Sequence, residues 1–330
     1  MNDVPRYGKA KTIDFKDIPI IDVQEIETAD GKARIGAEIV KAAETVGFFY
    51  LSGHGIAPSL IERAFATSKM FFELPEHEKS SITVDQNQRS WMAQGLARLE
   101  GSKTHDAKEV FFWGWDIGPD DADLNAGVAM VAQNQWPDHV APQFRTDLMP
   151  YYLAVVALGR SVMQAIALGL GKNVDFFDAG YNVPLARGQL VYYPKPNVSD
   201  HTEERFGAAA HSDFGALTTL MQDNNGGLQV QNKAGDWIAA PPIDGTFVCN
   251  IGDLLEQWTN GRLVSTKHRV LNMSKHDRYS IPIFFDPNSK TIIDPADFAC
   301  DAPLAYEAKT AGEHILARNK KNFGQYSKLK

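Results

Sequence analysis

The part of the chain after residue 185 is a series of short β-rich runs, and this series most constrains the fold that the chain can adopt. The runs lie at residues 188–193, 208–221, 227–231, 237–240, 246–251, 268–272 and 279–285. Turn-forming sequences separate them, among them Asn-Asn-Gly-Gly at 224–227 and Ala-Gly-Asp at 234–236, and such sequences are typical of hairpins. Short strands at this spacing predict a barrel or a jelly roll.

The part before residue 185 has a different character, because its apolar residues recur mainly at helical spacing. Helices are expected at 31–46, 58–74 and 142–170, and short strands at 18–22, 48–51 and 110–115,. A last helix is expected at 311–323. We therefore predict an α+β protein in which an N-terminal helical and mixed region, residues 1–180, packs on a β-core, residues 181–330. The two parts are expected to form a single compact unit.

The charge and hydropathy of the chain argue against several classes of function. Acidic residues outnumber basic ones by 41 to 33, which gives a formal net charge of -8, so no nucleic-acid partner is expected. The longest apolar stretch, 151–170, is interrupted by Arg160, Ser161 and Gln164. It predicts a buried helix and no membrane span. The polar start of the chain predicts no signal peptide, and we expect a cytoplasmic protein that is a monomer or a homodimer.

His211, Asp213 and His268 form the first candidate site. His211 and Asp213 lie two residues apart in a β-run, so their side chains are expected on one face of a strand. The pattern His-x-Asp is a weak signal by itself, but His268 begins another β-run and offers a third ligand. Two histidines and one carboxylate bind Fe(II) in oxygenases and leave coordination positions open. We predict that these three residues bind Fe(II).

Arg278 and Ser280 form the second candidate site, on the β-run that follows His268. Their spacing again places both side chains on one face of a strand. Arginine offers a planar fork of donors and serine a hydroxyl, which together suit a carboxylate. Tyr193, in the sequence Tyr-Tyr-Pro at 192–194, can add its phenol hydroxyl. The alternative is a surface arginine beside a solvated serine, and the position ten residues after His268 favours the pocket.

Taken in order, these motifs resemble the isopenicillin N synthase-like branch of the 2-oxoglutarate/Fe(II) oxygenases. The matching segments lie at 18–22, 47–50, 53–55, 72–75, 192–194, 211–219, 227–230, 250–253, 260–261, 268–270 and 278–280. The resemblance implies a double-stranded β-helix (jelly roll) core with flanking helices. It implies iron ligands at His211, Asp213 and His268. It also implies that Arg278, Ser280 and Tyr193 bind the distal carboxylate of 2-oxoglutarate.

The activity that the resemblance implies is that of a non-haem Fe(II) dioxygenase. Such an enzyme hydroxylates, desaturates or cyclises a small organic molecule with O2, and its co-substrate 2-oxoglutarate gives succinate and CO2. One alternative is an Fe(II) oxidase that needs no 2-oxoglutarate, as isopenicillin N synthase itself is. Another is a jelly-roll binding protein without catalysis, since a fold does not fix a function.

One position departs from the pattern of the family, and the substrate contacts are only broadly located. Many plant members have asparagine two residues before the tyrosine that matches Tyr193, and this chain has Val191 there, which removes a polar contact near the chelating end of 2-oxoglutarate. Substrate contacts are expected within 85–116 and near the C-terminus. The candidates are Gln94, Arg98, Lys108, Phe112, Trp113 and Trp115. A small or medium organic molecule is expected, such as an acid or an amino-acid derivative.

Overall fold

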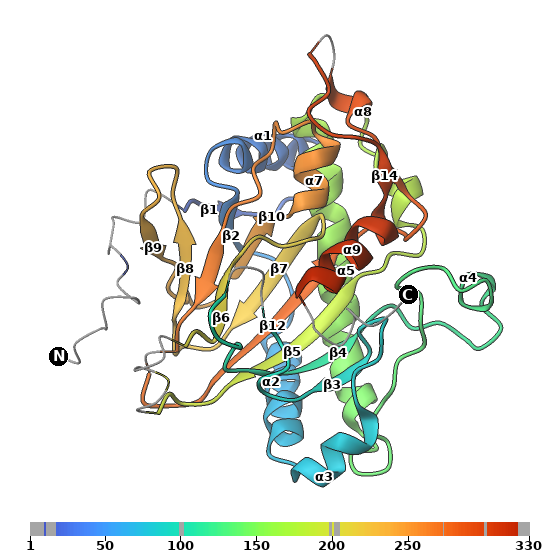
Figure 1. The fold of residues 1–330 in the computed structure, drawn as a ribbon. Coiled ribbons are helices and arrows are strands. Elements are labelled where there is room, and N and C mark those ends of the chain that lie inside the picture. The colour runs from blue at the N-terminus through green and yellow to red at the C-terminus, as the bar shows by residue number, and fades with distance from the viewer. Residues whose placement is uncertain are drawn as a thin grey trace.

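Two mainly antiparallel β-sheets lie at the centre of the protein (Figure 1). The computed structural model describes residue 10 and residues 18–98, 102–197, 200, 205–272, 274–299 and 302–322. The large sheet contains, in spatial order, β1 (Ile20–Asp22), β2 (Phe48–Ser52), β10 (Phe247–Ile251), β7 (Leu217–Gln222), β12 (Arg278–Phe285), β5 (Arg187–Tyr193), β4 (Glu109–Trp113) and β3 (Ser90–Met92). Strands from before and after residue 180 therefore share one sheet.

The small sheet contains, in spatial order, β6 (Ala208–His211), β11 (His268–Val270), β8 (Leu228–Gln231) and β9 (Trp237–Ala239). Apolar side chains fill the space between the two sheets. Tyr50 and Val248 come from the large sheet, and Leu228 and Val270 come from the small one. Because alternate residues of each strand point to this interior, polar side chains on the same strands reach the interior as well. The arrangement confirms the predicted α+β jelly roll with flanking helices.

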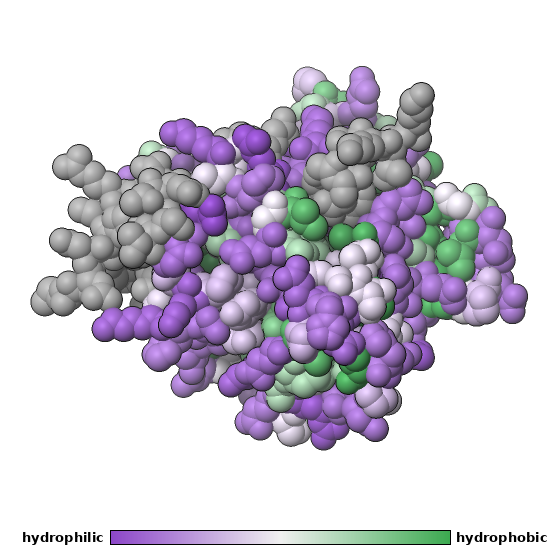
Figure 2. All heavy atoms as spheres, turned by 60° about the horizontal axis from the view of Figure 1, so that its bottom comes forward, coloured by the Kyte–Doolittle hydropathy of each residue, from purple (hydrophilic) through white to green (hydrophobic). Residues whose placement is uncertain are grey.

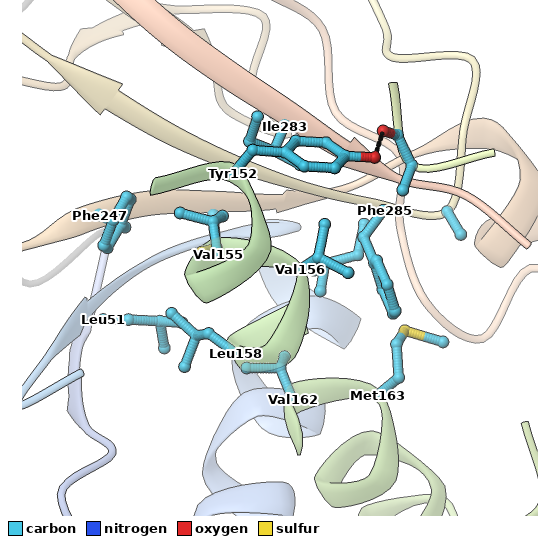
Figure 3. Close-up of a cluster of buried hydrophobic side chains, with 14 of the residues drawn as sticks. Leu51, Tyr152, Val155, Val156, Leu158, Val162, Met163, Phe247, Ile283 and Phe285 are labelled. Carbon is cyan, nitrogen blue, oxygen red and sulfur yellow. Dashed lines mark hydrogen bonds between the residues drawn. The ribbon is translucent and has the colours of Figure 1, made fainter. Parts of the chain in front are cut away.

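Three helices cover the other face of the large sheet: α1 (Ala29–Thr45), α2 (Pro58–Phe72) and α5 (Phe144–Gly169). Figure 3 shows how Val155, Val156 and other side chains of α5 point into the apolar cluster, while the Tyr152 hydroxyl donates a hydrogen bond to the Ala186 carbonyl at 2.6 Å. By length and hydropathy α5 could cross a membrane, but 61% of its most apolar window is buried inside the protein. It is the buried helix that the sequence predicts.

The remaining elements are short, apart from the last helix. They are α3 (Glu76–Lys79), α4 (Ala122–Asn125), α7 (Asp253–Trp258), α8 (Ala296–Ala299), α9 (Ala311–Asn322) and the paired strands β13 (Ile292–Ile293) and β14 (Lys309–Thr310). The predicted end of α9 at residue 323 lies outside the described residues. On the face drawn in Figure 2, hydrophobic residues form small separated groups among hydrophilic ones, which is ordinary for a protein surface in water.

The run at 208–221 differs from its prediction as a single strand. It forms β6 in the small sheet and β7 in the large sheet, and residues 212–216 cross between them. The crossing is fixed by Asp286, which accepts a hydrogen bond from the Ala216 N–H at 2.9 Å. A Cβ atom at Gly215 would lie 1.7 Å from Asp286 Oδ1, so only glycine fits there. Asp213 therefore lies beyond the end of β6, and strand periodicity was the wrong argument for its direction.

Candidate metal and carboxylate site

His211 and His268 lie directly opposite each other on the neighbouring antiparallel strands β6 and β11. Opposed residues on such strands project from the same face with their Cβ atoms close together, and the two imidazole centroids are 4.3 Å apart. Asp213 joins them from the crossing segment. Its Oδ1 lies 3.9 Å from His211 Nε2 and 3.6 Å from His268 Nε2. One ligand atom from each side chain lies within 4.8 Å of the others, so the three predicted residues converge.

The backbone fixes the orientation of both imidazole rings. His211 Nδ1 lies 2.7 Å from the Ala209 carbonyl oxygen, and His268 Nδ1 lies 3.2 Å from the Thr266 carbonyl oxygen. A carbonyl can only accept, so each Nδ1 carries the proton and donates it. Each Nε2 faces Asp213 and, in the neutral form of the ring, presents a lone pair,. A histidine that binds a metal commonly has its other ring nitrogen held in this way.

The Asp213 carboxylate is held through one oxygen only. Its Oδ2 accepts hydrogen bonds from Thr218 Oγ1 at 2.6 Å and from Asn250 Nδ2 at 2.7 Å. Its Oδ1 faces the two histidines. In the sequence Asn250 is only part of the matching segment 250–253, and the role of Thr218 was not foreseen. Both depend on contacts between distant segments, so no local pattern could have indicated them.

The protonation states suit a metal ion. Burial, together with the neighbouring His268, lowers the pKa of His211 to about 3, so this imidazole is neutral at physiological pH. Burial by itself would raise the pKa of Asp213, but His268, His211 and the hydrogen bonds from Thr218 and Asn250 outweigh burial and hold that pKa below its usual value. A neutral imidazole beside an ionised carboxylate is a donor set that fits Fe(II).

Arg278 lies fully buried on β12, opposite Tyr193 on β5. Its Nε donates to the Gly226 carbonyl at 2.6 Å, and one terminal nitrogen donates to Gln222 Oε1 at 3.1 Å. The other terminal nitrogen is buried and has no hydrogen-bond partner among the described residues. A buried donor without a partner is costly and rare, so a guanidinium in this state fits an anion that binds beside it.

Two further predicted residues share the face of Arg278. Ser280 is two residues along β12, and it pairs with Val191 of β5 and with Gln222 of β7. The Tyr193 ring centroid lies 4.7 Å from the centre of the Arg278 guanidinium. Val191 is buried directly across from Ser280, so the departure from the family pattern adds an apolar wall at this point.

Two adjoining cavities open between the sheets. The inner cavity, about 80 Å³, is lined by His211, Asp213, His268, Tyr193, Arg278 and Ser280 among others. The outer cavity, about 70 Å³, is lined by Gln88, Lys108, Phe112, Gln189, Phe284 and Asn319 among others. The two cavities share five lining residues: Lys108, Gln189, His211, Asp213 and Phe284. The six predicted site residues thus line one continuous space.

The candidate substrate contacts separate into two groups. Lys108 and Phe112 line the outer cavity as expected, and Asn319 of α9 supplies the expected wall from near the C-terminus. Trp113 is wholly buried in the core, Gln94 and Arg98 are exposed, and Trp115 lines cavities elsewhere. Gln189 was not foreseen, although its position two residues before Val191 on β5 places it on the same face.

Models of two protein families match most of the chain. Residues 18–139 match the model of the N-terminal domain of non-haem dioxygenases in morphine synthesis, and residues 187–287 match that of the 2OG-Fe(II) oxygenase superfamily. A homoarginine-6-hydroxylase of Oryza sativa is 34% identical over 94% of this chain and 98% of its own length. A probable iron/ascorbate oxidoreductase of Dictyostelium discoideum is 36% identical over 85% of this chain and 84% of its own length.

Solved structures agree with these sequence matches. A full-length protein of Neurospora crassa, crystallised in complex with alpha-KG (2-oxoglutarate) and thymine, superposes with a TM-score of 0.80 and 30% identity. The match covers 94% of this chain and 98% of that one. Relatives with this identity and coverage show the family to which the chain belongs. The protein therefore belongs to the 2-oxoglutarate/Fe(II)-dependent oxygenases, in their isopenicillin N synthase-like branch.

Proposed function

We propose that His211, Asp213 and His268 are the residues that bind Fe(II) in this enzyme. Support comes from the convergence of their ligand atoms and from the backbone carbonyls that fix both rings. The family to which the chain belongs uses this metal together with 2-oxoglutarate. Three protein ligands leave the remaining coordination positions for small molecules.

Arg278, Ser280 and Tyr193 bind the distal carboxylate of 2-oxoglutarate in this proposal. The observation that carries it is the buried terminal nitrogen of Arg278, which has no partner among the described residues. Arg278 and the three metal-site residues line the same inner cavity. An extended diacid can therefore place one carboxylate at Arg278 and its other end at the metal.

Iron and 2-oxoglutarate, when bound, supply the activation of O2 and the co-products succinate and CO2. The residues of the chain position the metal ligands and the co-substrate and limit the access of water. Thr218 and Asn250 hold Asp213 in place, Arg278 compensates the charge of the co-substrate, and the apolar walls restrict water. The outer cavity, next to the metal residues, is the place for a small organic substrate.

The test is a turnover assay with a pool of small metabolites. The purified protein is incubated with Fe(II), O2 and 2-oxoglutarate, and succinate is measured with and without the pool. We expect the pool to increase succinate, and mass spectrometry to detect a product that has gained oxygen or lost hydrogen. Consumption of O2 that does not depend on 2-oxoglutarate would favour the oxidase alternative. The cytoplasmic location and the monomeric or homodimeric state stay predictions of the sequence.

A further inference from the structure

The alternation of residues along β5 and β12 gives the joined cavities a deep end and an outer end. On β12, Arg278, Ser280, Pro282 and Phe284 all line the inner cavity, at every second position. Six residues of strand extend over about 20 Å. Arg278, which is fully buried, marks the deep end, and the half-buried Phe284, where the second cavity adjoins, marks the outer end. Since the proposed function places 2-oxoglutarate at the deep end, the substrate belongs at the outer end.

Each cationic side chain that the structure describes at the outer end already has an acidic partner. Lys108 Nζ lies 2.9 Å from Asp106 Oδ2, and an Arg187 terminal nitrogen lies 2.8 Å from Asp286 Oδ2. Both acids are buried, with side chains 1% and 0% exposed. The Asp106 Oδ1 also accepts a hydrogen bond from the Ala209 N–H, two residues before His211. Each pair is therefore neutral and fixed in place.

The acidic side chains of the described cavity walls leave no free negative charge at the outer end either. Among the described residues that line either cavity, Asp213 is the only acidic one, and it belongs to the metal site. Among the cationic residues of the described lining, only Arg278 lacks an acid partner, and it lies at the deep end. The two charges of 2-oxoglutarate balance Arg278 and the single net positive charge of the iron site. The described walls thus leave no charge for a substrate to neutralise.

Polar groups nevertheless remain at the junction of the two cavities. The Gln189 carboxamide has no hydrogen-bond partner among the described residues and lines both cavities. An ammonium group has three donors, and Lys108 uses one on Asp106, so it has donors to spare. Three aromatic rings, those of Phe112, Phe214 and Phe284, form part of the same wall. Such a wall suits a flat molecule with hydrogen-bonding groups.

We propose that the substrate is an uncharged molecule with adjacent carbonyl and N–H groups, such as an amide, lactam or cyclic ureide, and that Lys108 and Gln189 recognise it. Burial of an uncompensated charge is costly, so the neutral outer end selects against free acids and amines. This differs from the acid or amino-acid derivative expected from the sequence. The inference rests on the proposed function, because the deep end must be occupied by 2-oxoglutarate.

The experiment measures binding without turnover. The protein is loaded without oxygen with Fe(II) and saturating 2-oxoglutarate, and calorimetry first verifies that the co-substrate binds. A small-molecule extract is separated by ion exchange at neutral pH into anionic, neutral and cationic fractions. Each fraction is added and the unfolding temperature is recorded. We expect the neutral fraction to raise Tm by about 3 °C or more, and the charged fractions to leave it unchanged.

Two variants change the charge of the outer end in opposite directions. Lys108→Met leaves Asp106 without its cationic partner, so the cationic fraction should now raise Tm. Asp106→Asn leaves Lys108 without its acidic partner, so the anionic fraction should raise Tm instead. The double variant, Lys108→Met with Asp106→Asn, makes the outer end neutral again. The neutral fraction should then raise its Tm, but by less than in the wild-type protein. The double variant is expected to fold, because the side-chain oxygen of the introduced asparagine can still accept a hydrogen bond from the Ala209 N–H.

The outcomes separate the two proposals. Failure of the wild-type protein to bind 2-oxoglutarate would contradict the proposed function and with it this inference. Normal binding of 2-oxoglutarate, combined with a larger shift from a charged fraction or with no shift from the neutral one, would overturn the inference alone.

Discussion

Replacement of Arg278 by methionine is expected to weaken 2-oxoglutarate binding by about 1000-fold. The guanidinium is fully buried and has one terminal nitrogen without a partner among the described residues. Removing one partner of a buried charge pair costs about 3–5 kcal/mol, and each 1.4 kcal/mol is a factor of ten in Kd. Arg278→Lys keeps the charge but loses the fork. The loss of a charged hydrogen bond, about 1.5–3 kcal/mol, should then weaken binding by roughly 10- to 100-fold.

The assay is calorimetric titration of 2-oxoglutarate into the Fe(II)-loaded protein in the absence of oxygen. Urea unfolding of the unloaded variants should show little loss of stability, because methionine replaces a buried ion that is only partly satisfied. Arg269→Met is the matched control. Arg269 is also buried, donates to Gln229 Oε1 at 2.7 Å and lies over the Trp237 ring, and it lines neither cavity. Binding by Arg278→Met within about fivefold of wild type would refute the assignment of the carboxylate site.

Three further changes address the support of the iron site, the acid stability of α9 and the contact between α1 and α5. Asn250→Ala leaves Asp213 Oδ2 with one of its two hydrogen bonds and should lower Fe(II) affinity by about 10- to 100-fold; an unchanged anaerobic titration would exclude such a role. Burial, with Lys309 and Arg318 nearby, lowers the pKa of His314 from 6.5 to about 4. The unfolded chain therefore binds this proton more readily, and the stability contribution is full above about pH 6.5 and lost by up to about 3 kcal/mol as the pH falls to about 4. His314→Gln should reduce that loss in urea titrations near pH 7 and pH 4.5, and an identical pH dependence would contradict it. A Cβ on Gly36 would lie 2.0 Å from the Ala165 carbonyl oxygen, so Gly36→Ala should cost about 1–3 kcal/mol, and an unchanged urea midpoint would show that the helices adjust.

Local patterns were sufficient to predict most of the elements and to select candidate site residues that converge in the structure. Apolar periodicity located α1, α2 and α5 within a few residues, and turn chemistry located most strands of the jelly roll. The distant His268 could be grouped with His211 because each lies in a β-run, and the register of β6 and β11 shows that the two residues meet. Arg278 and Ser280 share a face because β12 is a regular strand, where a period of two holds,.

Contacts between distant segments could not be predicted in this way. Asp213 faces the histidines because a crossing segment, braced by Asp286, directs it there. Asn250 reaches Asp213 from another strand. Lys108 and Asp106 are separated by one residue, but only the packing of β4 beside β5 shows that their ion pair lies at the cavity wall. The charge balance of the outer end could not be predicted either, because it depends on side chains that come together from distant segments.

Anaerobic titration of Fe(II) into the wild-type protein and Asp213→Ala tests most directly whether His211, Asp213 and His268 bind the iron. Loss of the carboxylate ligand should reduce the affinity by at least about 100-fold, more than the loss of a supporting hydrogen bond would. Asp244→Ala, which removes an exposed carboxylate in the turn before β10, should bind Fe(II) like the wild type. Near-normal affinity in Asp213→Ala would contradict the assignment of the metal site.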